Sequence, residues 1–176
     1  ITSRLVGSEM CIRDSLSTTH KRATFFTSAT IAAPDFEYFK QETGLPFALT
    51  MQAKSPFNFR ENTRLYIPNG SSPTPKEDGF QDFMIDQMDE LVTACQGGAF
   101  LLFSSYANMN YAHDRLASIF NTNGWTCYKQ GEGLSKLEII RRFKAHGNAV
   151  LFATKSFWEG VDVQGDALRL VVIDKV

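Results

Sequence analysis

A polar loop that directly follows a short apolar run carries the side chains best suited to chemistry in this sequence. The apolar run, Ala149–Ala153, is typical of a buried strand in a parallel sheet. Open α/β sheets bind their ligands beyond the carboxyl ends of such strands, which predicts a binding loop here. The alternative is a surface loop with ordinary polar residues. The loop supplies two hydroxyls, a cation and two carboxylates, on Thr154, Ser156, Lys155, Glu159 and Asp162.

Further strands must hold this loop in place, and the sequence supplies them at regular intervals. Apolar runs predict strands at Ala99–Phe103 and Leu168–Ile173 and a short strand at Trp125–Tyr128. We expect the first two of these to be central and buried, together with Ala149–Ala153. Helical patterns alternate with the strands, and this order predicts an α/β fold in which helices flank a parallel sheet with right-handed crossovers.

Apolar residues at helical spacing predict three helices around these strands. The first is stopped by Gly97-Gly98. The third begins at Ser135, which forms the S-x-x-E pattern of a capping box with Glu138, and runs to about His146. The apolar faces expected are Phe80, Met84, Met88, Leu91 and Cys95 for the first helix, Ala112, Leu116, Ile119 and Phe120 for the second, and Leu137, Ile140 and Phe143 for the third.

The earlier part of the chain is less regular. A β-rich run, Ala23–Thr27, precedes a helical stretch, Asp35–Thr43, which closes at Gly44, where a glycine just past the helix end is expected. A passage rich in Pro, Asn and Ser follows, and within it only Arg64–Ile67 resembles a strand. We place a boundary between two lobes near Ser55.

The two ends of the chain differ from the rest. Ile1–Ser15 has no sustained periodicity and resembles a translated adaptor or vector segment, so we expect a non-native or disordered segment there. A genuine strand and turn from an upstream domain is the alternative. Leu170–Val176 is an apolar strand with no helix after it, although a helix normally covers such strands. We therefore expect the chain to be cut at both ends.

Composition is that of a globular protein. The 176 residues are 43% hydrophobic and 21% charged, with a net charge of −1. No apolar run approaches the roughly 20 residues that span a bilayer, and no secretory signal is visible. Three cysteines without metal-ligand spacing favour a reducing compartment. We expect a cytoplasmic protein that does not associate with membranes.

Charge is distributed unevenly. Residues 77–90 contain six acidic side chains and no basic one. Residues 129–155 contain six basic side chains and two acidic ones, Glu132 and Glu138. A local excess of positive charge beside a polar loop at a strand end suits an anionic polymer. A solvated helix face is the alternative.

Three segments together carry a resemblance to superfamily 2 helicases. Phe26–Thr30 resembles the Ser-Ala-Thr motif III, Leu102–Tyr106 resembles motif IV, and Thr154–Asp162 resembles motif V. The longer segment from Ala153 to Lys175 resembles the DinG/XPD-like branch of ATP-dependent DNA helicases, and Ser55-Pro56-Phe57 resembles the DinG group. The resemblance covers residues 20–176. It implies a RecA-like second motor lobe over 55–176, cut at its carboxyl end, and the tail of a first lobe over 16–54.

The resemblance also implies roles for individual residues. In such helicases two lobes clamp ATP, and single-stranded or forked DNA runs across both of them. Hydroxyl groups can donate hydrogen bonds to the phosphate oxygens of DNA, and such contacts do not depend on the base sequence. Phe157 and Trp158 either stack on a base or pack in the core beneath the loop. The roles implied are motif III coupling for Ser28, Ala29 and Thr30, DNA binding for Ser104, Ser105, Tyr106, Thr154 and Lys155, and ATP binding for Glu159, Gly160 and Asp162.

Several helicase parts are absent from the printed sequence. There is no G-x-x-x-x-G-K-[ST] phosphate loop and no Asp-Glu-Ala-His-type motif to hold Mg²⁺. There is no four-cysteine set for an iron–sulfur cluster, which would have to lie in sequence outside this chain. We expect a monomer that does not hydrolyse ATP alone. The alternatives are a nucleic-acid-binding module without ATP turnover and an unrelated Rossmann-like enzyme, such as a nucleotide-sugar transferase.

Overall fold

The structure is a computed structural model that describes residues 25–28, 36–70, 72–157 and 160–175. By their internal contacts the residues form two compact units, 1–65 and 66–176. The predicted segment Ile1–Ser15 lies outside the described residues. The lobe boundary near Ser55 stays a prediction.

The described residues of the first unit contain two short helices. Helix α2, Glu37–Thr43, ends as predicted at Gly44, whose φ of 69° is the left-handed conformation that glycine adopts without strain. Helix α3, Phe59–Asn62, was not predicted. The predicted β-rich run is wrong for its described part, because residues 25–28 form no strand.

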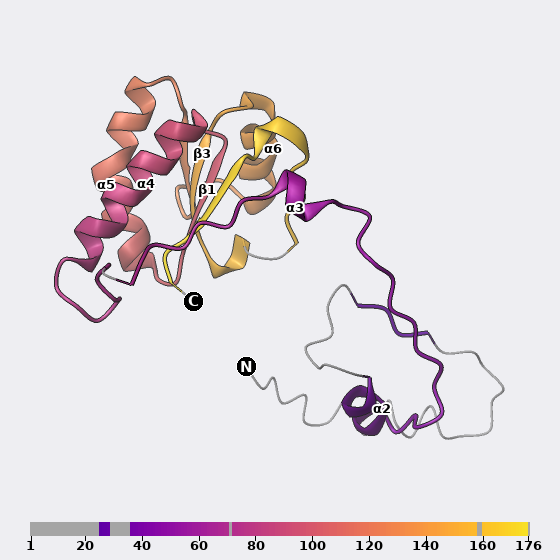
Figure 1. Ribbon diagram of the computed structural model, residues 1–176. Coiled ribbons are helices and arrows are strands. Elements are labelled where there is room, and N and C mark those ends of the chain that lie inside the picture. Colours follow the sequence, from indigo (N-terminus) through magenta and orange to yellow (C-terminus); the bar gives the residue numbers. More distant parts are fainter. Residues whose placement is uncertain (1–24, 29–35, 71, 158–159, 176) are drawn as a thin grey trace. The chain divides into compact units, whose positions relative to one another are not determined.

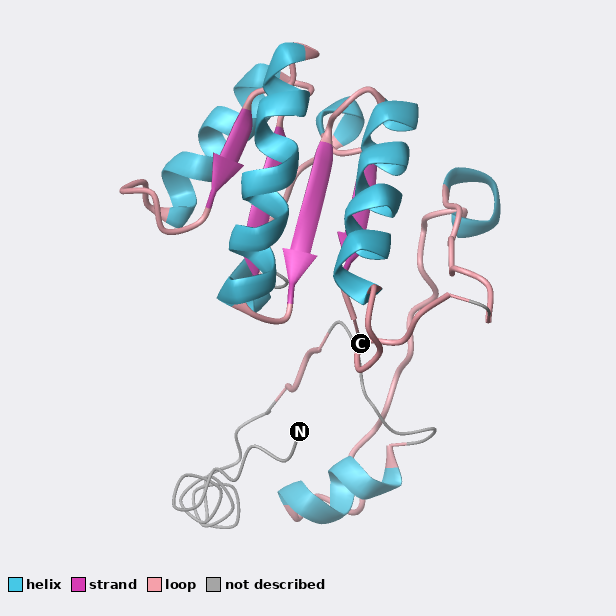
Figure 2. Cartoon of the chain, turned by 90° about the vertical axis from the view of Figure 1, so that its left-hand side faces the viewer, coloured by secondary structure: helices cyan, strands magenta, loops and turns pink. Residues whose placement is uncertain are grey.

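The second unit is built on a four-stranded sheet whose strand order is β2-β3-β1-β4. All three pairings are parallel, and Figure 2 shows the strand arrows pointing the same way. This confirms the predicted α/β fold. The strands are β1 (Ala99–Phe103), β2 (Cys127–Lys129), β3 (Val150–Thr154) and β4 (Leu170–Ile173).

Helices cover both faces of this sheet. Helices α4 (Phe80–Cys95) and α5 (Tyr106–Thr122) lie on one face and α6 (Lys136–His146) on the other, as Figure 1 shows. Alternate residues of β1 face opposite sides of the sheet. Leu101 and Phe103 belong to the core under α4 and α5, and Phe100 and Leu102 belong to the core under α6. Two short 3₁₀ turns, Lys155–Phe157 and Gly165–Ala167, complete the unit.

The predicted strands β1 and β3 are confirmed as central and fully buried. The prediction that the last strand is central is wrong, because β4 pairs with β1 alone among the described residues and lies at the sheet edge. Its Val171 and Ile173 side chains are 51% and 44% exposed. The predicted strand Arg64–Ile67 is also wrong, because these residues have no ladder partner among the described residues.

The predicted helix faces are correct in part. Ser135 caps α6 as expected, since its hydroxyl accepts a hydrogen bond from the Glu138 backbone N–H at 3.3 Å. Met84, Met88, Ala112, Leu116, Phe120 and Phe143 are buried as predicted. Ile119 and Leu137 are exposed, and Ile139 takes the core position on α6 instead of Leu137. The four-residue interval from Ile139 to Phe143 sets that face.

Candidate nucleic-acid interface at the strand ends

Adjacent strands bring the predicted motif IV and motif V segments together. Strands β1 and β3 pair in parallel with Phe103 opposite Thr154, so the residues that follow each strand leave the sheet at the same edge. Ser104, Ser105 and Tyr106 follow β1, and Lys155 and Ser156 follow β3. Two segments about 50 residues apart therefore share one end of the sheet, as expected for a ligand site in an open α/β fold.

A glutamine that sequence reasoning did not select joins the two segments. Gln130 is the first residue after β2. Its Oε1 accepts hydrogen bonds from the Thr154 backbone N–H at 2.8 Å and from the Thr154 hydroxyl at 2.9 Å. Its Nε2 donates to the Tyr106 hydroxyl at 2.8 Å and to the Ser156 Oγ at 2.9 Å. The carboxamide thus uses both of its ends to tie motif IV to motif V.

A second polar network fixes Ser104 at the end of β1. The Asp174 carboxylate accepts from the Ser104 backbone N–H at 2.9 Å and from the Ser104 hydroxyl at 3.0 Å. Asn108 Nδ2 also donates to this carboxylate, at 3.1 Å. Asp174 is the first residue after β4. Sequence reasoning selected neither Gln130 nor Asp174. Both could have been found as the polar residue that directly follows an apolar strand.

The loop after β3 is anchored from α6. Lys136 Nζ donates to the Ser156 carbonyl at 2.6 Å and lies 5.2 Å from the centre of the Phe157 ring. Phe157 is 3% exposed and belongs to the core under α6, which favours core packing over base stacking for this residue. Trp158 lies outside the described residues. Lys155 is exposed at the start of the loop.

The residues predicted to bind ATP are described in part. Gly160 is exposed and has a φ of 67°, a backbone conformation that residues with a side chain rarely adopt. Asp162 is exposed and accepts a hydrogen bond from Gln164 Nε2 at 3.3 Å. Glu159, Ala29 and Thr30 lie outside the described residues. Ser28 is described in the first unit, where it is exposed.

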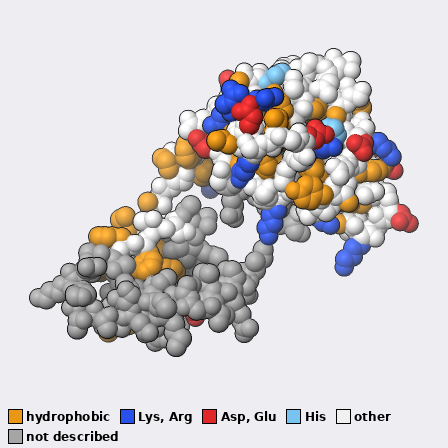
Figure 3. Space-filling model, turned by 180° about the vertical axis from the view of Figure 1, so that it is seen from behind, with side chains coloured by type: hydrophobic (Ala, Val, Ile, Leu, Met, Phe, Trp, Pro, Cys, Tyr) orange, Lys and Arg blue, Asp and Glu red, His pale blue; other side chains and the backbone are white. Residues whose placement is uncertain are grey.

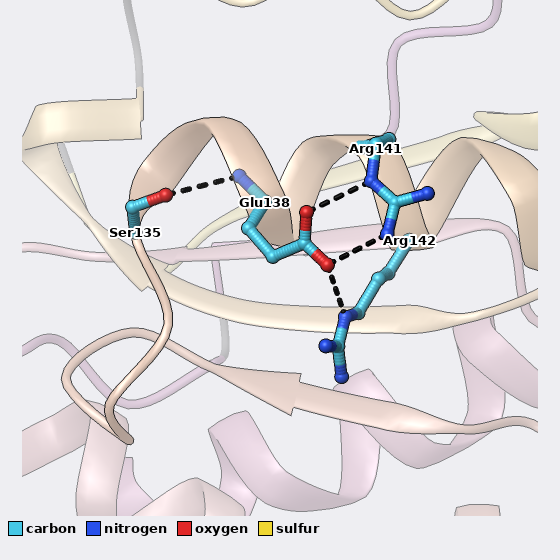
Figure 4. A network of polar contacts seen from close by, with 4 residues as sticks. All are labelled: Ser135, Glu138, Arg141 and Arg142. Carbon is cyan, nitrogen blue, oxygen red and sulfur yellow. Dashed lines mark hydrogen bonds and ion pairs between the residues drawn. The ribbon is translucent and has the colours of Figure 1, made fainter.

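Ion pairs engage part of the basic run of residues 129–155. The Glu138 carboxylate accepts two hydrogen bonds from Arg141, at 2.8 and 2.7 Å, and one from Arg142 at 2.6 Å, as Figure 4 shows. These hydrogen bonds, those of Arg141 first, lower the pKa of Glu138 to about 2. Lys129 pairs with Glu132 at 3.0 Å. In Figure 3 acidic and basic side chains of this unit lie side by side, so the basic run is in part a solvated, paired helix face.

Metal binding has no support in the described residues. No group of three His, Cys, Asp or Glu side chains that could hold an ion occurs among them. Within the same ranges, no helix is long and apolar enough to cross a bilayer.

The helix-flanked parallel sheet, with two polar segments meeting at the ends of its central strands, is the fold expected of a RecA-like lobe. Residues 88–176 match the helicase C-terminal domain family, and the chain belongs to that family. This excludes the alternative of an unrelated nucleotide-sugar transferase.

Similarity to curated proteins indicates which helicases the chain resembles. The chain is 34% identical over 152 residues to the ATP-dependent DNA helicase YoaA of Escherichia coli K12, an alignment that covers 86% of the chain and 23% of the relative. It is 31% identical over 170 residues to the ATP-dependent DNA helicase DinG of Photobacterium profundum, covering 93% and 24%. It is 29% identical over 160 residues to a protein of Bacillus subtilis named 3'-5' exonuclease DinG, covering 87% and 17%. The predicted resemblance to DinG-like helicases is confirmed, and the chain spans a quarter or less of the length of these relatives.

Proposed function

We propose that this chain is part of a DinG-like helicase that couples ATP hydrolysis to translocation on single-stranded DNA and to duplex unwinding. In this proposal residues 55–176 are the second motor lobe and residues 16–54 the tail of the first. The complete protein acts in the cytoplasm as a monomer on single-stranded or forked DNA. It holds Mg²⁺ with residues outside this chain.

One observation supports the proposal above the others: β1 and β3 are adjacent and in register, so Tyr106, Lys155 and Ser156 leave the same end of the sheet. All three are exposed. Hydroxyls and a cation grouped in this way suit the phosphate backbone of DNA, which positions a protein without specifying sequence. Lys155 has no carboxylate within ion-pair distance among the described residues, so its charge is available to a phosphate.

A salt series tests the DNA contact. Lys155→Ala should weaken the binding of single-stranded oligonucleotides of every sequence and should make the dependence on salt shallower by about one counterion. Lys144→Ala is the matched control, because Lys144 is also an exposed cation and lies in the last turn of α6. Filter binding of the 176-residue chain and both variants gives the slopes. Equal slopes for all three proteins would remove Lys155 from the interface.

We further propose that Glu159, Gly160 and Asp162 face ATP in the complete enzyme. A carboxylate is a good acceptor for ribose hydroxyls, and a glycine lets the backbone approach a ligand closely. Asp162→Ala should leave DNA binding without nucleotide nearly intact and should lower DNA-stimulated ATP hydrolysis. If Asp162→Ala abolished DNA binding while Lys155→Ala affected only ATP turnover, the two roles would be reversed.

The chain alone should not hydrolyse ATP, since its sequence contains neither a phosphate loop nor an Asp-Glu-Ala-His-type motif. An ATPase assay on the 176 residues with single-stranded DNA tests this. Turnover that survives Asp162→Ala would show that the chemistry lies elsewhere. The second candidate, a nucleic-acid-binding module without turnover, predicts that the longer protein also lacks DNA-stimulated ATPase activity.

A further inference from the structure

We propose that Gln130 is a positioning residue that directs the hydroxyl protons of Tyr106 and Ser156 toward a bound phosphate. The inference deepens the proposed function and rests on it. It identifies the hydroxyls at the strand ends that can donate a hydrogen bond to DNA.

The orientation of the Gln130 carboxamide follows from its partner on β3. A backbone N–H can only donate, so the atom that lies 2.8 Å from the Thr154 nitrogen must be the amide oxygen. The amide nitrogen then lies 2.8 Å from the Tyr106 hydroxyl and 2.9 Å from the Ser156 Oγ. Since an amide nitrogen only donates, both hydroxyl oxygens accept.

Accepting from Gln130 determines where each hydroxyl proton points. A hydroxyl has one proton, and when a neighbouring N–H occupies a lone pair, that proton is directed away from the neighbour. Tyr106 is 54% exposed, and Ser156 is exposed as well, so both protons are available to an external acceptor. Both oxygens lie within 3 Å of the same nitrogen, which places them close enough to serve one phosphate group. The exposed Lys155 neighbours Ser156 and adds a positive charge.

Two other hydroxyls at this end of the sheet, those of Thr154 and Ser104, have internal acceptors. The Thr154 hydroxyl donates to the Gln130 Oε1, and Thr154 is only 7% exposed. The Ser104 hydroxyl donates to the Asp174 carboxylate, which can only accept. The Ser105 hydroxyl caps α5, where it accepts from the Asn108 backbone N–H at 3.2 Å, and Ser105 is half-buried. The exposed hydroxyl donors are therefore those of Tyr106 and Ser156. The sequence pattern grouped Ser104, Ser105, Tyr106 and Thr154 together as DNA-binding hydroxyls, and it did not assign Ser156 to DNA.

Double-mutant cycles test the role of Gln130. Binding of a fluorescent oligothymidylate to the 176-residue chain is measured for Tyr106→Phe, Ser156→Ala and Gln130→Met, and for each pair with Gln130→Met. We expect each single change to weaken binding about tenfold, the value of one hydrogen bond to a charged group. In the Gln130→Met background, Tyr106→Phe and Ser156→Ala should each cost less than about threefold, because the protons are no longer directed. Ser118→Ala, an exposed serine on α5, is the matched control and should not change binding.

Gln130→Glu separates orientation from simple support of the loop. A carboxylate at this position accepts from Tyr106 and Ser156 and reverses both hydroxyls, so binding should fall further than in Gln130→Met. Gln81→Glu, an exposed site at the start of α4, controls for the added charge. Thermal melts identify any loss that comes from unfolding. Fully additive cycles, or a Gln130→Glu variant that binds as well as Gln130→Met, would overturn the inference.

Inorganic phosphate distinguishes this inference from the proposed function. Phosphate titrations followed by the backbone amide signals of Lys155 and Ser156 use the same variants. If phosphate binds with the expected cycle but the oligonucleotide does not bind, the proposed function fails and the Gln130 inference stands. If the oligonucleotide binds with additive cycles, the inference alone fails. If neither ligand binds, both are overturned.

Discussion

Arg169, just before β4, caps the carboxyl end of α4. Its guanidinium donates to the Cys95 carbonyl at 3.1 Å and to the Gln96 carbonyl at 3.0 Å. The last carbonyls of a helix have no partner inside the helix and carry the negative end of its dipole, which a cation stabilises. A residue just before the edge strand β4 thus holds the end of the helix that precedes β1.

We therefore expect Arg169→Ala to lower the free energy of unfolding by about 1–2 kcal/mol. Arg169→Lys should recover only part of this loss, because an ammonium group lacks the planar fork that reaches two carbonyls at once. Urea denaturation of the three proteins measures the differences. An alanine variant as stable as the parent would show that water satisfies these carbonyls equally well.

Gly97 should tolerate no side chain. Its φ is +77°, and an added Cβ would lie 2.1 Å from the Asn148 carbonyl oxygen. Gly124 is the matched control, with a φ of +83° and open space around its Cβ position. We expect Gly124→Ala to cost about 1 kcal/mol for the backbone conformation alone and Gly97→Ala about 3 kcal/mol or more. Equal losses in chemical denaturation would show that the clash relaxes without cost.

The pairing of Glu138 with Arg141 and Arg142 should appear as a pH dependence of stability. The pKa of Glu138 falls from 4.5 to about 2 in the folded chain, so the folded state favours the ionised carboxylate. The stabilisation is complete above pH 4.5 and is lost as the pH falls toward about 2. The difference in unfolding free energy between the parent and Glu138→Gln should therefore shrink across this window. A difference that stays constant would contradict the assignment.

The Cys127 thiol should be unreactive while the chain is folded. Burial raises its pKa to about 12, and its Sγ lies 3.6 Å from the Trp125 carbonyl and 3.8 Å from the Ala117 carbonyl. Only the thiolate reacts with alkylating reagents. We expect iodoacetamide at pH 8 to label Cys127 at least about 100-fold more slowly in the native chain than in denaturant. Peptide mapping by mass spectrometry reads out this site, and rapid native labelling would indicate local opening.

Structural features that depend on residues close together in the sequence could be predicted from it. The apolar runs located β1 and β3, and the S-x-x-E pattern located the cap at Ser135, because each depends on local periodicity or on one turn of helix. The partners of Gln130 were not predictable in this way, since Tyr106 and Thr154 lie 24 residues away on either side and meet it only when the strands pair. The edge position of β4 likewise depends on strand order, which an apolar run does not encode.

The carboxamide that organises the strand ends is attached to the shortest strand of the sheet. Strand β2 has three residues and, in the part of the chain that the structure describes, lies at the sheet edge beside β3. Few ladder hydrogen bonds hold such a strand, so it can detach at a free-energy cost below that of global unfolding. Its detachment would withdraw Gln130 and release the Tyr106 and Ser156 hydroxyls while the buried strands β1 and β3 stay intact. Amide hydrogen exchange should accordingly be faster in β2 than in β1, and a bound phosphate should slow it.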